Sequence, residues 1–597
     1  MSGLAGVYWL DGQPADPRLV RRMLEAVIHR GADGLFQHED SFVALGCAAS
    51  CTTPESPGSS QLFGGEPSGL WLSLDGRVDN RDDLQAALGG CPRSATDSEL
   101  VLRAYQRWGE ESPRFIVGDF AYVIWDPGAR RIFCARDHLG VRPLYYYTDG
   151  RRFLWASELR QLFQHPAVPR RPNEGMVAEY LNAEPASLEE TLYQGIFRLP
   201  PAHFLVVEPG VLRKRRYWEP RSVRPLRLRS DQEYTESFHA TFEVAVRSRL
   251  RSSGPVAAQL SGGVDSSCVV GMCQDLFRNG SVTHRGFETF SLVFPSLPCD
   301  ESSYVRQAVD FWNLKSNELT PPLDPDWYAA CAHRYLDFPD HPNFHMSDII
   351  STQARHKGFF VILTGLGGDN WYSGAPQSRL RRTLDRLRHQ SRLASAPALA
   401  SDLIRSLRRR VRHGPVVASW IPDIFARRTN LADRLRKGQA ERGLTSGVLA
   451  HCLELGDRAS ARYGVEYRHP FHDLRLIELA LGLPANLLWR NGQTKFVLRR
   501  AMEGRVPETI LQRATKAEFS AAFARAFECD NIASLFRSPV IAEQGWIDPR
   551  RLSLMYREFI EKWATGHADY LPHLWPLSMF VGIELWFRAA FPNGCRG

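Results

Sequence analysis

The sequence predicts two domains of different fold class: a strand-rich α+β or sandwich-like domain over residues 1–215, and an α/β domain with a parallel sheet over residues 216–597. The chain has 597 residues, far more than one ordinary domain needs. Short strand-like runs separated by turn clusters fill the first part. Apolar strand-like runs then alternate with helical patterns, as in a parallel sheet.

Composition and charge exclude several classes of protein. Hydrophobic residues make up 44% of the chain and charged residues 23%, which is typical of a globular protein. No apolar run approaches the ~20 residues of a membrane span, and no signal pattern opens the chain, so we expect a cytoplasmic protein without a membrane partner. The net charge of +8 is local, because eleven arginines lie between Arg379 and Arg412. A nucleic-acid partner is therefore not expected.

In the first domain, three apolar runs predict strands and one segment predicts a helix. The strand-like runs are Leu70–Leu74, Phe120–Trp125 and Pro143–Tyr147. Asp97–Tyr105 has an acidic first turn and predicts a helix.

A glycine turn between a strand and a helix organises the second domain. Pro255–Ala258 reads as a buried strand, and Cys268–Phe277 as a helix. Glycines let the backbone of the turn approach a bound group, and the free N–H groups at the helix start attract anions. The turn lacks the ending of a Walker loop. We predict a cradle for a phosphate chain, formed by Leu260, Ser261, Gly262, Gly263, Ser266 and Ser267.

Two further apolar runs, Thr289–Phe294 and Phe359–Leu363, predict neighbouring strands. The second leads into a glycine-rich turn that contains Thr364, Gly365 and Asp369. Open α/β sheets bind ligands at the carboxyl ends of their strands, so this turn is a candidate binding site. From the residues alone, Asp369 suits a helix cap and a metal ligand equally.

The string SGGVDSS resembles the pyrophosphate loop of ATP pyrophosphatases, which cut ATP to AMP and pyrophosphate. In the first domain the strings MSGLAG, HRGADG and RDHLGVRPLY are similar to those of glutamine amidotransferases of the N-terminal-nucleophile type. The whole chain thus resembles the asparagine synthetase superfamily. This resemblance implies an N-terminal-nucleophile-hydrolase-like sandwich followed by an ATP-pyrophosphatase-type synthetase domain with a helical insertion at about 375–440.

The resemblance also implies ATP and Mg²⁺ as cofactors. Asp265 and Asp369 would bind the metal, because a carboxylate beside a phosphate cradle would otherwise repel the nucleotide. The backbone of Leu292 would contact the adenine, and Thr364 and Gly365 would belong to the same nucleotide site.

Three catalytic residues are carried over from matching motifs. Lys495 lies in TKFVLRR, and Lys516 lies in RATKAEF, whose spacing has one extra residue. Lysines suit the charge that develops on the α-phosphate and on the leaving pyrophosphate. Glu466 lies in GVEYRHPFHD and would give catalytic support. A buried ion pair with Arg468 or with a neighbouring residue is the alternative for Glu466.

Several departures from the family pattern predict that the glutaminase chemistry is lost. Ser2 stands where the family has a nucleophilic cysteine, and a hydroxyl is a weaker nucleophile than a thiol. Asp75-Gly76-Arg77 replaces Asn-Gly-Glu, although Asp97, which would bind the substrate amine, remains. In the second domain Leu366 replaces the glutamate of asparagine synthetases and the tyrosine of β-lactam synthetases. The acceptor side, which is the part of the site that would bind the attacking amine, is therefore rebuilt.

These features favour a lasso-peptide cyclase, which would adenylate an Asp or Glu side chain and join it to the peptide's N-terminal amine. The expected partners are a precursor or leader-cleaved core peptide, a leader peptidase and a leader-binding protein. The basic segment Arg379–Arg412 would hold the peptide or its delivering partner. Alternatives are a β-lactam synthetase-like cyclase, an ammonia-dependent asparagine synthetase and a nucleotide-binding scaffold without turnover.

Overall fold

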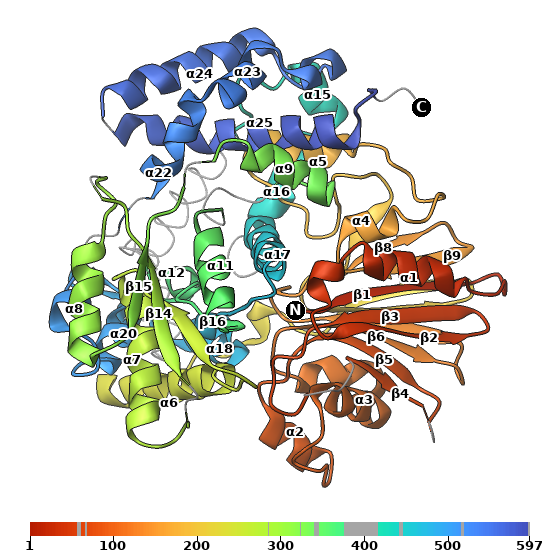
Figure 1. Cartoon of the computed structure of the whole chain (residues 1–597), viewed down its shortest axis with the longest axis horizontal. Helices are drawn as coiled ribbons and strands as arrows, with labels where there is room; N and C mark the ends of the chain where they lie inside the picture. Colours follow the sequence, from red (N-terminus) through yellow and green to blue (C-terminus); the bar gives the residue numbers. More distant parts are fainter. Residues whose placement is uncertain are drawn as a thin grey trace, which may run out of the picture.

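Two antiparallel sheets of six strands each form the first domain (Figure 1). The computed structural model describes residues 1–56, 61–65, 68–283, 286–295, 297–322, 324–339, 345–374, 416–440, 446–514, 517, 519–566 and 568–594. The first sheet has the order β10-β8-β9-β1-β3-β2, with the bounds β1 Gly3–Trp9, β2 Gly34–Asp40, β3 Val43–Ala49, β8 Tyr145–Thr148, β9 Arg152–Ala156 and β10 Ile196–Arg198. The second has the order β12-β11-β7-β6-β5-β4, with the bounds β4 Leu62–Gly64, β5 Trp71–Gly76, β6 Phe120–Asp126, β7 Arg131–Arg136, β11 His203–Glu208 and β12 Val211–Arg216.

Alternating side chains bury both faces of these sheets. In β1, Leu4 and Tyr8 point between the two sheets, and the ring of Tyr8 lies 5.2 Å from that of Trp125 in β6. Val7 points the other way, into a core that helices cover. The covering helices are α1 Pro17–Glu25 on the first sheet, and α2 Arg81–Ala87 and α3 Asp97–Trp108 on the second. The expected sandwich is therefore confirmed.

The second domain is built on a five-stranded sheet in which all strand pairs are parallel. Its order is β15-β14-β13-β16-β17, with the bounds β13 Val256–Gln259, β14 Phe287–Leu292, β15 Ser316–Leu319, β16 Val361–Leu363 and β17 Glu466–Arg468. Successive side chains of β13 again face two cores, because Ala258 packs against one set of helices and Ala257 against another. The flanking helices include α6 Asp231–Arg249 and α7 Val264–Arg278 on the first face, and α11 Asp348–His356 on the second. The predicted parallel sheet is confirmed.

Helices from the end of the chain return to the first domain. α25, Leu571–Ala590, packs on α9, Trp327–Tyr335, and on α5, Glu174–Leu181, of the first domain (Figure 1). Of the expected helical insertion, residues 375–415 lie outside the described residues, and with them the basic segment Arg379–Arg412. The described remainder holds two helices, α15 Asp423–Arg428 and α16 Leu431–Ala440. Among the helices described, none is both long and apolar enough to cross a membrane.

Buried charges join the two domains, and Glu466 is their centre. Its carboxylate accepts hydrogen bonds from Arg77 Nη1 at 3.1 Å, Arg142 Nη2 at 2.6 Å and Arg468 Nη2 at 2.8 Å. Thr52 Oγ1 donates a further one at 2.5 Å. Burial alone would raise the pKa of Glu466, but these three arginines outweigh burial and hold the pKa well below its ordinary value. Three of the four partners come from the first domain, so this contact spans the interface.

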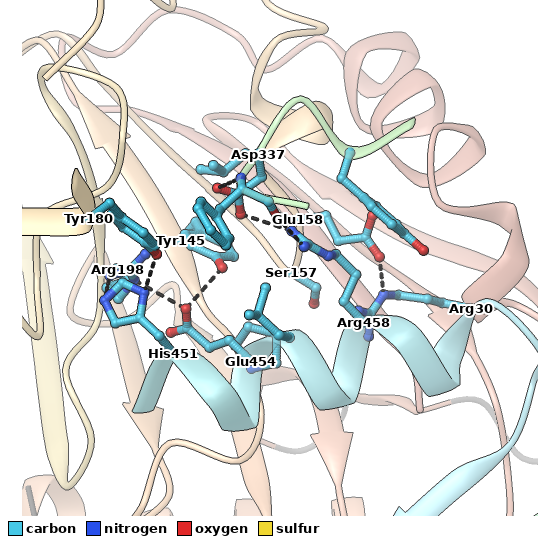
Figure 2. Close-up of a pocket in the computed structure, with 15 residues that line it drawn as sticks. Arg30, Tyr145, Ser157, Glu158, Tyr180, Arg198, Asp337, His451, Glu454 and Arg458 are labelled. Carbon is cyan, nitrogen blue, oxygen red and sulfur yellow. Dashed lines mark hydrogen bonds and ion pairs between the residues drawn. The ribbon is translucent and has the colours of Figure 1, made fainter. Parts of the chain in front are cut away.

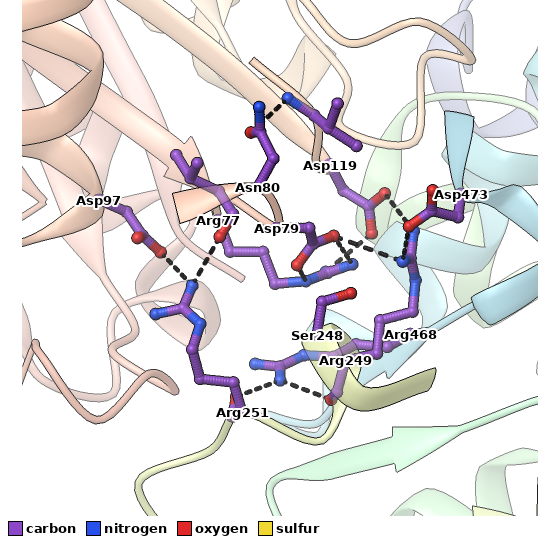
Figure 3. A network of polar contacts seen from close by, with 12 residues as sticks. Arg77, Asp79, Asn80, Asp97, Asp119, Ser248, Arg249, Arg251, Arg468 and Asp473 are labelled. Carbon is purple, nitrogen blue, oxygen red and sulfur yellow. Dashed lines mark hydrogen bonds and ion pairs between the residues drawn. The ribbon is translucent and has the colours of Figure 1, made fainter. Parts of the chain in front are cut away.

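The buried ion pairs between the two domains, called the seam below, continue between helix α6 and the loops of the first domain (Figure 3). Arg77 also binds both carboxylate oxygens of Asp79 at 3.0 Å. Arg249, at the end of α6, pairs with Asp79 Oδ2 of the first domain at 3.6 Å and is also bound by Asp473 Oδ2 of its own domain at 2.6 Å. Arg251, close before β13, binds Asp97 Oδ2 at 2.8 Å. The entrance of the central strand of the second domain is therefore held by side chains of the first.

We predict that Arg77→Met lowers the free energy of unfolding by about 3–5 kcal/mol, because it leaves the buried carboxylates of Asp79, Asp119 and Glu466 undercompensated. Urea denaturation followed by tryptophan fluorescence measures this loss. Arg103→Met is the matched control, since the Arg103–Glu99 pair of 2.8 Å is exposed on α3. This control should cost about 0.5 kcal/mol or less. Equal losses for the two variants would contradict a role of the seam in joining the domains.

Candidate active site

A cavity of about 590 Å³ opens at the carboxyl ends of β13, β14 and β16. Strand order reverses at this place, because the chain leaves β13 for β14 and β15 on one side and returns to β16 on the other. Crevices of this kind are where open α/β sheets bind ligands. Its polar wall consists of the turn after β13, the turn after β16 and the segment around Lys495.

The turn after β13 has the geometry of an anion cradle. Gly262 has φ +73°, and a Cβ at this residue would lie 2.7 Å from Tyr304 Cβ, so both conformation and space require glycine. Ser261 Oγ lies 3.0 Å from Ser266 Oγ and accepts a hydrogen bond of 3.3 Å from the backbone N–H of Gly263. Helix α7 begins directly after this turn, so its amino end points at the cavity.

The turn after β16 lies against the start of α7, and this contact is possible only with glycines. A Cβ on Gly365 would lie 2.5 Å from the backbone nitrogen of Ser266. A Cβ on Gly368 would lie 2.3 Å from Asp265 Cγ. The contact brings Asp265, from the first turn, next to Asp369, from the second.

Lys495 lies between these two carboxylates. Its Nζ is 2.6 Å from Asp265 Oδ2 and 2.7 Å from Asp369 Oδ1. Burial alone would lower the pKa of Lys495, but the two carboxylates outweigh burial and raise it above its ordinary value. Two carboxylates beside a phosphate cradle fit Mg²⁺, which binds proteins through one or two carboxylates and takes further oxygens from substrate phosphates.

The opposite part of the cavity is apolar. Leu292 ends β14 and lines the cavity, together with Phe290, Phe294, Met346 and Ile350. Such a wall suits a flat, largely apolar ring such as a nucleobase. Leu366 also lines the cavity and remains 43% exposed, so the acceptor side presents a hydrocarbon side chain where a proton relay would need a titratable group.

The structure brings together most of the predicted site residues. The cavity is lined by Leu260, Ser261, Gly263, Asp265, Ser266, Leu292, Thr364, Gly365, Asp369 and Lys495. Gly262 shapes the turn without lining the cavity. Ser267 is fully buried in α7, because one further helical residue rotates its side chain by about 100° away from that of Ser266. Lys516 lies outside the described residues.

The prediction of a catalytic role for Glu466 is corrected by its position. Glu466 begins β17 and pairs with Val361, the first residue of β16, whereas the binding turn follows the end of β16. It does not line the cavity, and its carboxylate is occupied by three arginines and Thr52. The alternative, a buried ion pair with Arg468 or a neighbour, describes it better, because Arg468 and two arginines of the first domain bind it. The motif alone could not separate these two interpretations, because both place the glutamate near a buried strand.

Three charged residues line the cavity that the sequence interpretation did not assign: Glu301, Arg499 and Arg513. Arg499 donates to the backbone carbonyl of Thr494 at 2.7 Å and to that of Leu511, which holds the segment of Lys495. Arg513 forms an ion pair with Glu301. The available signal for Arg499 and Arg513 was their place beside Lys495 and Lys516 in the two basic motifs, whereas Glu301 lies in neither motif.

A second enclosed cavity, of about 10 Å³, lies between the first domain and helix α17, Gly447–Ala461 (Figure 2). Polar side chains form part of its wall: His451 Nδ1 lies 2.6 Å from Tyr180 Oη, and His451 Nε2 lies 2.7 Å from Arg198 Nη1. Burial lowers the pKa of His451 to about 3, so its ring is neutral at pH 7. The volume has room for about one water molecule. This cavity is part of the polar packing between the domains.

The residues that would bind glutamine in the first domain are engaged in other contacts. Ser2 is buried; its backbone N–H donates to Asp75 Oδ1 at 2.8 Å, and its Oγ accepts from the backbone N–H of Ser50 at 3.1 Å. Asp97 is 2% exposed and is bound by both Arg81 and Arg251. An amine substrate would have to displace two guanidinium groups to reach this carboxylate.

Comparisons with known proteins agree with this architecture. The model of the Asparagine synthase family matches residues 237–588, and that of the Glutamine amidotransferase domain matches residues 1–218. Glutamine-hydrolyzing asparagine synthetase 3 of Bacillus subtilis is 26% identical over 478 residues, which are 74% of each chain. Glutamine-hydrolyzing asparagine synthetase 1 of the same organism is 23% identical over 86% of each chain. Amidase chry2 of Gibberella zeae is 28% identical over 59% of this chain and 54% of its own length.

The synthase model covers more than half of the sequence and includes both turns of the cavity and the segment of Lys495. The chain therefore belongs to the asparagine synthase family and is an ATP-dependent, amide-forming ligase of the asparagine synthetase kind.

Proposed function

We propose that this ligase closes a macrolactam in a lasso-type peptide. An Asp or Glu side chain of the peptide is adenylated, and the peptide's own N-terminal amine then forms the isopeptide bond. The observation that carries the proposal is a contrast between the two domains. The nucleotide side of the cavity keeps its cradle, its paired carboxylates and Lys495, whereas Arg77 and Asp97 of the glutamine-binding region are engaged in buried ion pairs. Such an enzyme activates a carboxylate without a glutamine-derived amine.

In the first step a carboxylate oxygen of the peptide attacks the α-phosphorus of ATP, and the bond to pyrophosphate breaks. The cradle of Ser261, Gly263 and Ser266 binds the leaving phosphates through N–H and hydroxyl groups. Asp265 and Asp369 would hold Mg²⁺, which neutralises phosphate charge. Lys495 orients the two carboxylates and adds positive charge beside them.

In the second step the N-terminal amine attacks the acyl carbon, AMP leaves and the amine loses a proton to form the amide. Two features of the structure leave room for a peptide. On the acceptor side, Leu366 offers an apolar surface. Beside the apolar wall, a neighbouring cavity of about 150 Å³ shares Phe294 and Met346 with the nucleotide cavity, and its lining includes proline, aromatic and charged side chains. A peptide chain longer than one amino acid could extend into this space.

We predict that Asp265→Asn lowers the rate of ATP–pyrophosphate exchange by about 100-fold or more, because one of the two metal-binding carboxylates and one partner of Lys495 are lost together. Isotope exchange measures the effect in the presence of the peptide. Asp275→Asn is the matched control: Asp275 lies on the same helix α7 but pairs with Arg505 outside the cavity. If the two variants exchanged at the same rate, the metal assignment would fail.

We predict no release of glutamate from glutamine by the protein, and none by Ser2→Cys. The cysteine would restore a nucleophile, but Asp97 would remain bound to Arg81 and Arg251. A coupled glutamate dehydrogenase assay measures this release. Turnover by Ser2→Cys alone would reveal a working glutamine pocket and would sink the proposal that the domain has lost this chemistry.

The peptide itself supplies the decisive test of function. A leader-cleaved core peptide encoded beside this gene, incubated with ATP and Mg²⁺, should lose the mass of one water and yield AMP and pyrophosphate. An N-acetylated peptide should support ATP–pyrophosphate exchange but no ring closure, because it keeps the carboxylate and lacks the amine. Replacing the Asp or Glu that forms the ring by its amide should abolish both ATP–pyrophosphate exchange and ring closure. Asparagine formation from aspartate and ammonium, with the peptide inert, would contradict the proposal.

A further inference from the structure

Arg513 is the charged residue of the nucleotide cavity whose contacts lead directly to the phosphate-binding turn. Its Nη1 donates a hydrogen bond of 3.3 Å to the backbone carbonyl of Gly262. Its guanidinium lies 4.2 Å from the ring centre of Tyr304, and it forms an ion pair with Glu301. Both side chains of the pair are only 8% exposed, so the pair is nearly desolvated and fixed in place.

The bond to the carbonyl of Gly262 constrains the anion cradle through the peptide plane. In a trans peptide the C=O of one residue and the N–H of the next point in opposite directions. The carbonyl of Gly262 is bound by Arg513, so the N–H of Gly263 is directed the other way, toward Ser261 Oγ in the wall of the cavity. Tyr304 packs directly against the same turn, since a Cβ on Gly262 would lie only 2.7 Å from Tyr304 Cβ.

The ion pair has a second effect on phosphates. Glu301 lines the same cavity as the cradle, and its carboxylate would repel a polyphosphate chain. Arg513 supplies the opposite charge at contact distance, and a planar guanidinium can bind a carboxylate and stack on an aromatic ring at once. Arg513 therefore both orients the cradle and neutralises Glu301, which among the described residues of the wall is the acidic side chain not assigned to Mg²⁺.

We propose that Arg513 is a positioning residue for the leaving pyrophosphate: it acts through Gly262, Tyr304 and Glu301 to hold the cradle in its anion-binding form. This inference rests on the proposed adenylation, because it assigns the cradle to the β- and γ-phosphates. It predicts a selective effect. Ligands that contain a pyrophosphate group depend on Arg513, whereas AMP, which lacks that group, does not.

The test compares three ligands by isothermal titration calorimetry of the full chain with Mg²⁺: ATP, pyrophosphate and AMP. Arg513→Met should weaken the binding of ATP and of pyrophosphate by about 10-fold or more and leave AMP binding unchanged. In ATP–pyrophosphate exchange, the KM for ATP should rise more than kcat falls. Arg505→Met is the matched control, since Arg505 pairs with Asp275 of α7 away from the cavity, and it should change none of these values.

Two outcomes would overturn the inference. Equal weakening of all three ligands would mean that Arg513 only supports the local fold, and unchanged binding of ATP and pyrophosphate would mean that it does not act on the cradle. Should Arg513→Met fail to fold, Arg513→Lys keeps the charge and most of the volume but loses the planar fork, and it should have the same selectivity to a smaller degree. Failure of the wild-type protein to bind ATP and pyrophosphate would instead refute the proposed function, and the inference with it.

Discussion

The arrangement of both domains depends on one buried carboxylate, that of Glu466. It begins β17, at one edge of the parallel sheet, and its partners Arg77, Arg142 and Thr52 belong to the first domain. Burying this charge is costly in isolation, so the site is stable only while all of its partners remain in place. The pairs of Arg249 with Asp79 and of Arg251 with Asp97 extend the same constraint to α6 and to the strand that leads into the cradle. The first domain thus holds the sheet on which the nucleotide cavity is built.

The cavity depends on a second constraint, which is steric. Gly365 and Gly368 allow the turn after β16 to touch the start of α7, and no larger residue fits at either contact. This contact, more than any single polar group, sets the distance between Asp265 and Asp369. Lys495 then fits between them and fixes the third segment of the site. If β13 and β16 were not neighbours in the sheet, Asp265 and Asp369 would lie in two separate turns and would not share one site.

The two domains contribute differently to this protein: the first contributes contacts that hold the fold together, and the second contains the nucleotide cavity. The first domain keeps the family's strands and several of its motifs, yet Asp97 and Arg77 form ion pairs with residues of the second domain. The second domain keeps the phosphate-binding geometry, whereas Leu366 changes the acceptor side. Substitutions in the first domain should therefore act through stability more than through the chemical step.

The sequence by itself determined the fold class of both domains and the main parts of the site. Strand-like apolar runs separated by turn clusters predicted an α+β or sandwich-like domain, strands alternating with helical patterns predicted the parallel sheet, and the glycine turn between a strand and a helix predicted the cradle. These features are local, because period and turn chemistry act over a few neighbouring residues. Asp265, Asp369 and Lys495 were assigned through the resemblance of their short motifs to the asparagine synthetase superfamily, because from the residues alone Asp369 suited a helix cap equally well.

Only the tertiary structure decided what the remaining charged residues do. Glu466 and Arg513 both lie in short family motifs, but one is bound by arginines from the other domain and the other supports the turn of Gly262. Ser267 was expected beside Ser266, and the helical rotation between them buries it. The partners of such side chains lie hundreds of residues away in sequence, and the strength of an ion pair depends on burial and distance. Neither quantity is encoded in local sequence patterns, so they emerge only when the chain is folded.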